Sequence, residues 1–233
     1  MKPTKKAFLE TLKSFKIHKK VIDAFEEFDQ KDFFDMIFRG KYYSDETIPI
    51  GFGETSDHFL TLARMINYGN PKASSRVLEV GTGSGYSTAL LASLAREVVT
   101  VEINEQLASA AKKRVASAGM DNVRFFAGDG TGFDNGGDAF DVIIVFASCY
   151  TRPLSLLRLL RAEGRMVFPM GPLHQQQIAY AFNEMLKSDE GLIRTEFREF
   201  CTFKPIQGQY GTELFHLIDR DNIREGTEQE DGE

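Results

Sequence analysis

The chain has 233 residues, of which 42% are hydrophobic and 27% charged, as is usual for a soluble globular enzyme. This length is enough for one large domain with a substantial core. The longest unbroken apolar run, at 142–147, has six residues, far fewer than the roughly 20 that a membrane-spanning helix needs. We therefore expect no membrane segment.

The formal net charge of −6 is concentrated at the C-terminus, because residues 221–233 carry six acidic side chains and one arginine. We predict that this tail is disordered, and the nearly neutral remainder gives no reason to expect nucleic acid as a partner. Cys149 and Cys201 lie in no paired motif, which argues against a disulfide scaffold and a zinc site. No signal peptide is recognisable at the N-terminus, so we expect a cytoplasmic protein.

Apolar residues recur at helical spacing through residues 4–38, which predicts several short helices. A loop is expected at 41–53, followed by a helix over 59–66 with Ser56 or Asp57 as its N-cap. Gly69, Asn70 and Pro71 should end that helix. The apolar positions of the first three helical segments are Phe8, Leu12 and Phe15; Val21, Ile22, Phe25 and Phe28; and Phe33, Phe34, Ile37 and Phe38.

From residue 76 onward, short apolar strands alternate with helices. Strands are predicted at 76–80, 98–102, 123–127, 141–146 and 165–169, and helices at 86–94, 105–118 and 153–160. This alternation predicts an α/β fold with a doubly wound, mostly parallel, Rossmann-like sheet. Residues 178–182 and 214–219 could add a closing antiparallel pair. We expect a single domain over residues 1–220, in which 1–70 form an N-terminal helical layer and substrate loop and 71–220 form the cofactor-binding sheet.

The most informative segment is residues 77–86, VLEVGTGSGY, in which glycines follow an apolar strand at alternate positions and precede a helix. Such a turn lies at the switch point of a doubly wound sheet, where ligands bind. The dinucleotide fingerprint would place its third glycine at position 86, which is tyrosine here. The spacing G-x-G-x-G is instead that of methyltransferases using S-adenosylmethionine. The candidate cofactor-binding residues are Glu79, Gly81, Thr82, Gly83, Ser84 and Gly85; the alternative is a glycine-rich turn without a ligand.

Acidic residues follow the next two strands. Glu102 ends the second strand, where a carboxylate can accept both ribose hydroxyls, although an acid there is also found in dinucleotide enzymes and could be a surface residue. Asp129 ends the third strand and could accept from an adenine amino group, while Gly130 would leave room for the ring. Three elements at successive strand ends predict that S-adenosylmethionine is the cofactor.

Five segments resemble the protein-L-isoaspartate O-methyltransferase family: residues 77–86, 98–102, 122–130, 140–145 and 165–171. Residues 48–55, IPIGFGET, are similar to its lead-in to the substrate loop, and 203–208, FKPIQG, to its C-terminal signature. The resemblance covers roughly residues 42–212. It implies methyl transfer from S-adenosylmethionine to the carboxylate of isoaspartyl residues in damaged proteins; the ester then collapses to a succinimide, whose hydrolysis returns some aspartate. An ionised carboxylate needs no strong general base.

The chain departs from this family at the substrate loop, where the family's usual serine is replaced by Asp57. An ionised aspartate at 4 Å from a substrate carboxylate is repulsive by about 4 kcal/mol at an effective dielectric constant of 20. Ser56 could take the serine's role, Asp57 could be protonated or turned away, or the substrate could differ. Asp57 could also be only a helix cap. Ser56 and Asp57 are the candidate catalytic residues.

Three other functions stay open at this point. A relative could methylate another carboxylate or a small molecule, or the chain could be a catalytically silent protein that binds the same cofactor. A nicotinamide oxidoreductase is disfavoured by Tyr86.

Overall fold

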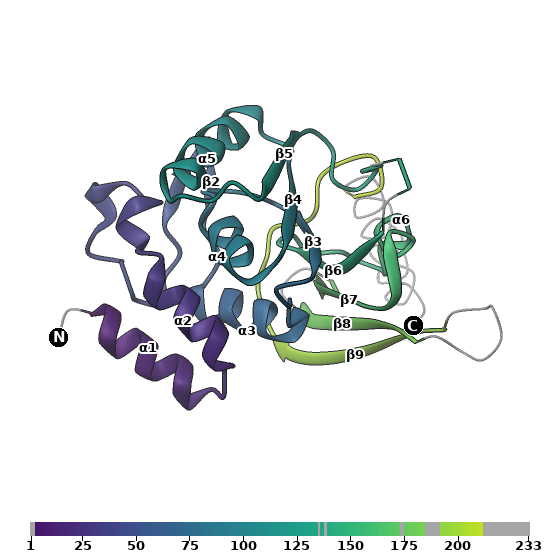
Figure 1. The fold of residues 1–233 in the computed structure, drawn as a ribbon, viewed down its shortest axis with the longest axis horizontal. Helices are drawn as coiled ribbons and strands as arrows, with labels where there is room; N and C mark the ends of the chain where they lie inside the picture. The colour runs from purple at the N-terminus through teal and green to yellow at the C-terminus, as the bar shows by residue number, and fades with distance from the viewer. Residues whose placement is uncertain (1–2, 135, 138, 173–174, 185–191, 212–233) are drawn as a thin grey trace, which may run out of the picture.

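The computed structural model describes residues 3–134, 136–137, 139–172, 175–184 and 192–211. Its centre is a seven-stranded sheet of order β5-β4-β3-β6-β7-β8-β9 (Figure 1). The five strands from β5 to β7 are parallel, whereas β8 is antiparallel to both β7 and β9. The predicted doubly wound, mostly parallel sheet is confirmed. The strands are β3 (Arg76–Val80), β4 (Glu97–Glu102), β5 (Val123–Ala127), β6 (Phe140–Val145), β7 (Leu160–Met170), β8 (Gln177–Glu184) and β9 (Leu192–Phe200).

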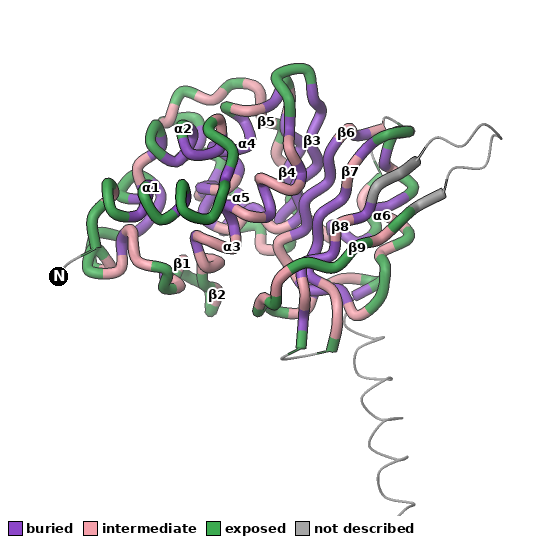
Figure 2. The backbone as a smooth tube through the Cα atoms, turned by 90° about the horizontal axis from the view of Figure 1, so that it is seen from below, coloured by how far each residue is buried: buried purple, intermediate pink, exposed green. Residues whose placement is uncertain are grey.

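Most residues of the central strands are buried, as the purple tube in Figure 2 shows for β3 and β6. Alternate side chains such as Val77 and Val142 belong to one hydrophobic cluster, and their neighbours Leu78 and Ile143 belong to a second. The first cluster lies beneath the helices α3 (Phe59–Gly69), α4 (Tyr86–Leu94) and α5 (Glu105–Ser117), and the second beneath the short α6 (Leu154–Leu157). This two-sided burial explains why the strands are almost continuously apolar.

An N-terminal helical layer packs beside α3 and α4 (Figure 1), as predicted. It contains α1 (Lys5–Ser14), α2 (Lys19–Glu27) and the 3₁₀ turns η1 (Gln30–Asp32) and η2 (Met36–Phe38). Four phenylalanine rings surround Tyr86 at centroid distances of 5.3–5.9 Å, which joins the layer to the start of α4. These rings are Phe25, Phe33, Phe34 and Phe59. Two of the apolar positions at helical spacing do not reach the core: Phe15 is 46% exposed and Ile37 is 77% exposed.

Several other expectations differ from the structure. The predicted helix over 153–160 is only one turn, since β7 already begins at Leu160. On its side away from β7, β8 pairs with β9, a strand that was not predicted; the expected strand at 214–219 and the acidic tail lie outside the described residues. Neither Ser56 nor Asp57 caps α3. Its N-cap is His58, and the carboxylate of Asp45 accepts the Leu60 N–H at 2.9 Å.

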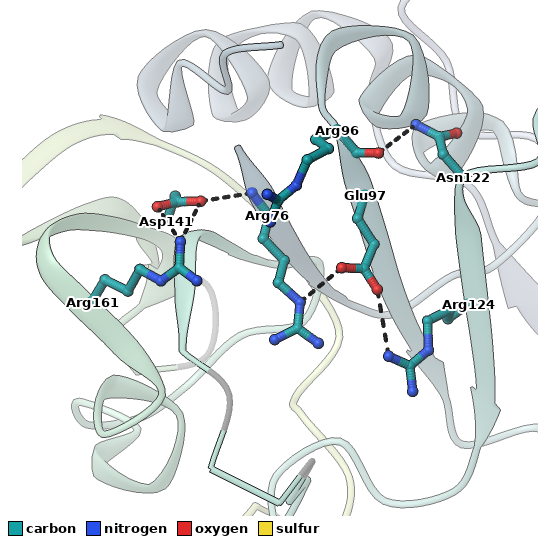
Figure 3. Close-up of polar contacts among 7 residues, drawn as sticks. All are labelled: Arg76, Arg96, Glu97, Asn122, Arg124, Asp141 and Arg161. Carbon is teal, nitrogen blue, oxygen red and sulfur yellow. Dashed lines mark hydrogen bonds and ion pairs between the residues drawn. The ribbon is translucent and has the colours of Figure 1, made fainter. Parts of the chain in front are cut away.

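Ion pairs join neighbouring strands at the end of the sheet where β3 and β4 begin (Figure 3). Arg76 Nε lies 2.9 Å from Glu97 Oε2, and Arg124 lies 3.4 Å from the other oxygen of Glu97. Asp141 accepts the Arg76 backbone N–H at 2.7 Å and lies 3.1 Å from Arg161 of β7. These contacts connect β5, β4, β3, β6 and β7 at the end of the sheet opposite the glycine-rich turn, so they fix strand register away from that turn.

Over the described residues, no helix combines the length and the apolar character required to cross a membrane.

Candidate active site

A cleft lies at the carboxyl ends of β3 and β4, next to the glycine-rich turn. Its walls include residues of the N-terminal layer, the hairpin of β1 (Pro49–Gly51) and β2 (Glu54–Thr55), the ends of the central strands, the helices α3, α4 and α5, and residues 204–207. Of the predicted site residues, the cleft is lined by Ser56, Asp57, Gly81, Thr82, Gly83, Ser84, Glu102 and Gly130. Residues that are far apart in sequence therefore meet at the switch point of the sheet.

Glycine is required in the turn by backbone conformation. Gly81, Gly83 and Gly85 have φ values of 97°, 55° and 87°, in the left-handed region that residues with a Cβ rarely adopt. A Cβ on Gly83 would lie 3.3 Å from the end of the Ile50 side chain, across the cleft. A larger side chain at Gly83 would therefore extend toward the space between the turn and the β1–β2 hairpin.

Gly85 has a different role from Gly83. It is the N-cap of α4 and does not line the cleft. A Cβ there would lie 3.0 Å from Val115 and 3.1 Å from Ala111, both on α5. The third glycine therefore allows α4 and α5 to pack closely.

Glu102 connects the turn to the end of β4. One carboxylate oxygen accepts the Gly83 N–H at 2.8 Å, and the other accepts the Asn104 N–H at 3.0 Å. Each carboxylate oxygen can accept more than one hydrogen bond, so both keep acceptor capacity at the wall of the cleft. Glu102 can thus order the turn and still accept from two neighbouring hydroxyls of a ligand.

Glu79 lies beneath the turn and not in the cleft lining. Its Oε2 accepts from Thr88 at 2.6 Å and from Thr100 at 2.7 Å, and Thr100 in turn lies 2.5 Å from the Thr82 hydroxyl. Its Oε1 is buried without a hydrogen-bond partner among the described residues. Burial raises the pKa of Glu79 to about 7. This network ties β3, β4 and α4 to Thr82 of the turn.

Asp129 and Gly130 are positioned differently from each other. Asp129 is not in the cleft lining: its carboxylate accepts the Gln209 N–H at 2.7 Å and both the backbone N–H and hydroxyl of Thr131. Gly130 lines the cleft, and a Cβ there would lie 2.5 Å from Val80. Asp129 thus attaches the C-terminal segment to the end of β5 in this structure; its contact with an adenine amino group stays a prediction.

Ser56 and Asp57 both line the cleft but differ in their bonding. The Ser56 hydroxyl accepts the Ile48 N–H at 2.9 Å and lies 3.2 Å from the Asp57 carbonyl oxygen, to which it donates. Its hydroxyl therefore already holds the loop together. Within the described part of the chain, by contrast, no group donates a hydrogen bond to the Asp57 carboxyl.

The surroundings of Asp57 favour the neutral acid. The side chain is half-buried in the cleft wall; desolvation there raises the pKa of its carboxyl to about 8, and the charge of the Glu79 carboxyl contributes to the rise. Both effects disfavour the ionised form. The repulsion between Asp57 and an anionic ligand, expected from the sequence, applies only to the ionised side chain.

Two residues of the cleft, Lys204 and Tyr86, were not predicted as site residues. Lys204 donates to the Gly53 carbonyl at 2.8 Å and pairs with Glu54 at 2.9 Å, so it joins the C-terminal segment to the β1–β2 hairpin. Tyr86 lines the cleft and anchors the N-terminal layer. Lys204 could have been found from its place in the family-like segment 203–208, and Tyr86 from its position directly after the third glycine of the turn. In the described residues, no group of His, Cys, Asp and Glu side chains has a metal-binding arrangement.

The comparison with protein families agrees with this architecture. Residues 3–211 match the family model of protein-L-isoaspartate(D-aspartate) O-methyltransferase. The protein-L-isoaspartate O-methyltransferase of Petrotoga mobilis is 36% identical over 193 residues, which cover 82% of this chain and 89% of that protein. The enzyme of the same name from Magnetococcus marinus is 38% identical over 195 residues, with 83% of each chain covered.

Solved structures share the fold. A Plasmodium falciparum structure described as a protein-L-isoaspartate O-methyltransferase in complex with S-adenosyl-L-homocysteine has a TM-score of 0.69 at 22% identity, and the match covers 87% of this chain and 97% of that one. A second protein-L-isoaspartate O-methyltransferase has a TM-score of 0.74 at 21% identity, covering 94% of this chain and 70% of that one. With the sequence match along nearly all of the described residues, the chain belongs to the protein-L-isoaspartate(D-aspartate) O-methyltransferase family.

Proposed function

We propose that this protein is an S-adenosylmethionine-dependent carboxyl O-methyltransferase that acts on L-isoaspartyl residues of damaged proteins. The observation that carries the proposal is the family match over residues 3–211, on a chain whose glycine-rich turn and Glu102 border one cleft. Two relatives that are 36% and 38% identical to this chain are named for this activity, and the matches cover most of their length.

The residues present fit the proposed cofactor. The left-handed glycines keep the turn free of side chains near the cleft wall, and Glu102 has acceptor capacity for the two ribose hydroxyls. The amino-acid portion of the cofactor would lie against Gly81, Thr82, Gly83 and Ser84. Glu79 would act indirectly, because it holds Thr82 in place through Thr100. Gly85 would also act indirectly, by allowing α4 and α5 to pack closely.

When bound, S-adenosylmethionine supplies an electrophilic methyl group: a carboxylate oxygen of the substrate bonds to the methyl carbon, the carbon–sulfur bond breaks, and sulfur keeps the electron pair as a neutral thioether. The chain's own task is to hold the isoaspartyl carboxylate against the methyl group, because proximity and alignment supply most of the rate. The acceptor is already ionised at neutral pH and needs no base. Residues 54–57 form the cleft wall best suited to this task.

The test is methyl transfer to two peptides that differ only in one linkage, isoaspartyl in one and aspartyl in the other. Release of S-adenosylhomocysteine is measured at pH 6.5 with each peptide. We expect turnover with the isoaspartyl peptide and at least a hundredfold less with its twin. Absence of turnover by a protein that binds S-adenosylhomocysteine would contradict the proposal.

A second candidate is methylation of a different acceptor, and Asp57 is the observation that favours it. If Asp57 is ionised in the working enzyme, it would attract a cationic or neutral substrate and repel a carboxylate. Asp57→Ser should then lower activity on the true acceptor and raise it on the isoaspartyl peptide.

We also propose that the enzyme works in the cytoplasm and does not use nucleic acid as a substrate. The free thiols of Cys149 and Cys201 are consistent with a reducing compartment. Cell fractionation with an antibody to the protein, and methylation assays with DNA and RNA as acceptors, test the two statements.

A further inference from the structure

The carboxyl group of Asp57 is unusual among the polar groups of the cleft. It lines the cleft, yet no described residue donates a hydrogen bond to it. Other carboxylates nearby are well supplied: Glu102 accepts two backbone N–H groups, and Glu54 pairs with Lys204. Asp57 is half-buried, so a carboxylate there would have no donor from the described residues, whereas a carboxylic acid has a hydrogen to donate to a ligand in the cleft.

The titratable groups around Asp57 also disfavour its ionisation. Glu79 of β3 lies close enough to raise the pKa of Asp57, and the charge of Asp57 contributes to the raised pKa of Cys201, which follows β9. On α4, burial raises the pKa of the Tyr86 hydroxyl, which therefore stays neutral. At the opposite walls, Glu102 is acidic and Lys204 is already bonded to Gly53 and Glu54.

We propose that Asp57 works as the protonated acid and donates its hydrogen to the carboxylate of the isoaspartyl substrate, so that the enzyme captures this anion only while Asp57 is neutral. This inference rests on the proposed function. The hydrogen bond goes to the carboxylate oxygen that is not methylated, which leaves the attacking oxygen's electron pair free. Ser56, whose hydroxyl is bonded within the loop, does not take this role.

The proposal has a kinetic signature. In the transition state the oxygen that is not methylated still carries part of the negative charge, so the hydrogen bond stabilises the bound substrate and the transition state to a similar extent. Loss of the donor should raise KM by roughly 10- to 100-fold, the usual worth of a hydrogen bond to a charged group, and should change kcat little. Since Asp57 loses its proton near pH 8, wild-type kcat/KM should be level at lower pH and then fall about tenfold per pH unit.

The experiment measures initial release of S-adenosylhomocysteine from pH 6 to pH 9.5, which is independent of how long the methyl ester survives. The peptide is acetylated, amidated and free of His, Cys, Lys and Tyr, so that none of its groups titrates over this pH range. Asp57→Asn provides a donor that does not titrate, and we expect it to remove most of the alkaline fall. Asp57→Ala provides none and should have a high KM at every pH. Asp23→Asn, the same change on an exposed α2 residue, should keep the wild-type profile.

Three results would overturn the inference: a wild-type profile that stays level to pH 9.5, a profile that rises with pH, or an Asp57→Asn profile with the same alkaline fall as wild type. The last result would assign the fall to another group, such as the cofactor's α-amino group, which titrates in the same range. Binding of S-adenosylhomocysteine shows that each variant is folded, and Asp57→Ser serves as a second donor that does not titrate. Absence of wild-type activity at pH 6.5 would instead contradict the proposed function.

Discussion

Replacing Gly85 with alanine should separate the structural glycine of the turn from those that border the cleft. Its φ of 87° lies in the left-handed region, which costs a residue with a Cβ about 1–2 kcal/mol. The new Cβ would lie 3.0 Å from Val115, 3.1 Å from the Ala111 Cβ and 3.2 Å from the Ala111 carbonyl oxygen. Such overpacking typically costs about 1–3 kcal/mol. The free energy of unfolding should therefore fall by about 2–5 kcal/mol.

Urea denaturation measures this loss, and isothermal titration with S-adenosylhomocysteine under folding conditions measures the affinity. Gly85→Ala should bind within about threefold of wild type, because position 85 does not line the cleft. Gly83→Ala is the matched control: its Cβ would approach only the end of the Ile50 side chain, so it should lose more affinity and less stability. A Gly85→Ala protein as stable as wild type, or one that loses more affinity than Gly83→Ala, would refute this division of roles.

Three further predictions concern single side chains. Glu102→Ala should weaken S-adenosylhomocysteine binding by roughly 1.5–3 kcal/mol for each lost ribose hydrogen bond, and unchanged affinity by calorimetry would mean that the ribose lies elsewhere. Tyr86→Ala should lower the free energy of unfolding by about 3–5 kcal/mol, because four phenylalanine rings pack on Tyr86; a loss below 1 kcal/mol in urea would contradict its anchoring role. Since the pKa of Asp57 is raised from 3.8 to about 8 on folding, the native state binds more protons between these values and its stability falls as pH rises through them. Asp57→Asn should remove this fall, stabilising the protein by on the order of 3 kcal/mol at pH 8, after allowance for partial exposure, and by less at pH 5; a gain in melting temperature that does not grow with pH would contradict it.

The sequence predicted the central part of the fold well because the relevant signals are local. The bounds of β3, β5 and α4 agree with the prediction to the residue, since apolar runs there are bounded by glycines or polar turns. The location of Glu102 and of the glycines of the turn was also predictable, because parallel strands place their carboxyl ends at the same end of the sheet.

The remaining features depend on contacts between distant residues. Asp45 lies 15 residues from the N–H that it caps, so the nearer Ser56 and Asp57 were the natural but incorrect choices. Phe15 has the spacing of a core residue, yet it is exposed and lies beneath the Arg64 guanidinium. Lys204 donates a hydrogen bond to the carbonyl of Gly53, which lies 151 positions earlier in the chain. No local pattern contains these partners, nor the surroundings that raise the pKa of Asp57.

The central claim is that this chain repairs isoaspartyl linkages, and the most direct measurement follows the linkage itself. A purified isoaspartyl peptide is incubated with the protein and excess S-adenosylmethionine, and its aspartyl isomer is separated by chromatography over successive hours. The account predicts that the aspartyl peptide accumulates through methylation, succinimide formation and hydrolysis, and that Glu102→Ala slows its appearance strongly. An isoaspartyl peptide that stays unchanged, with S-adenosylhomocysteine binding intact, would contradict the account.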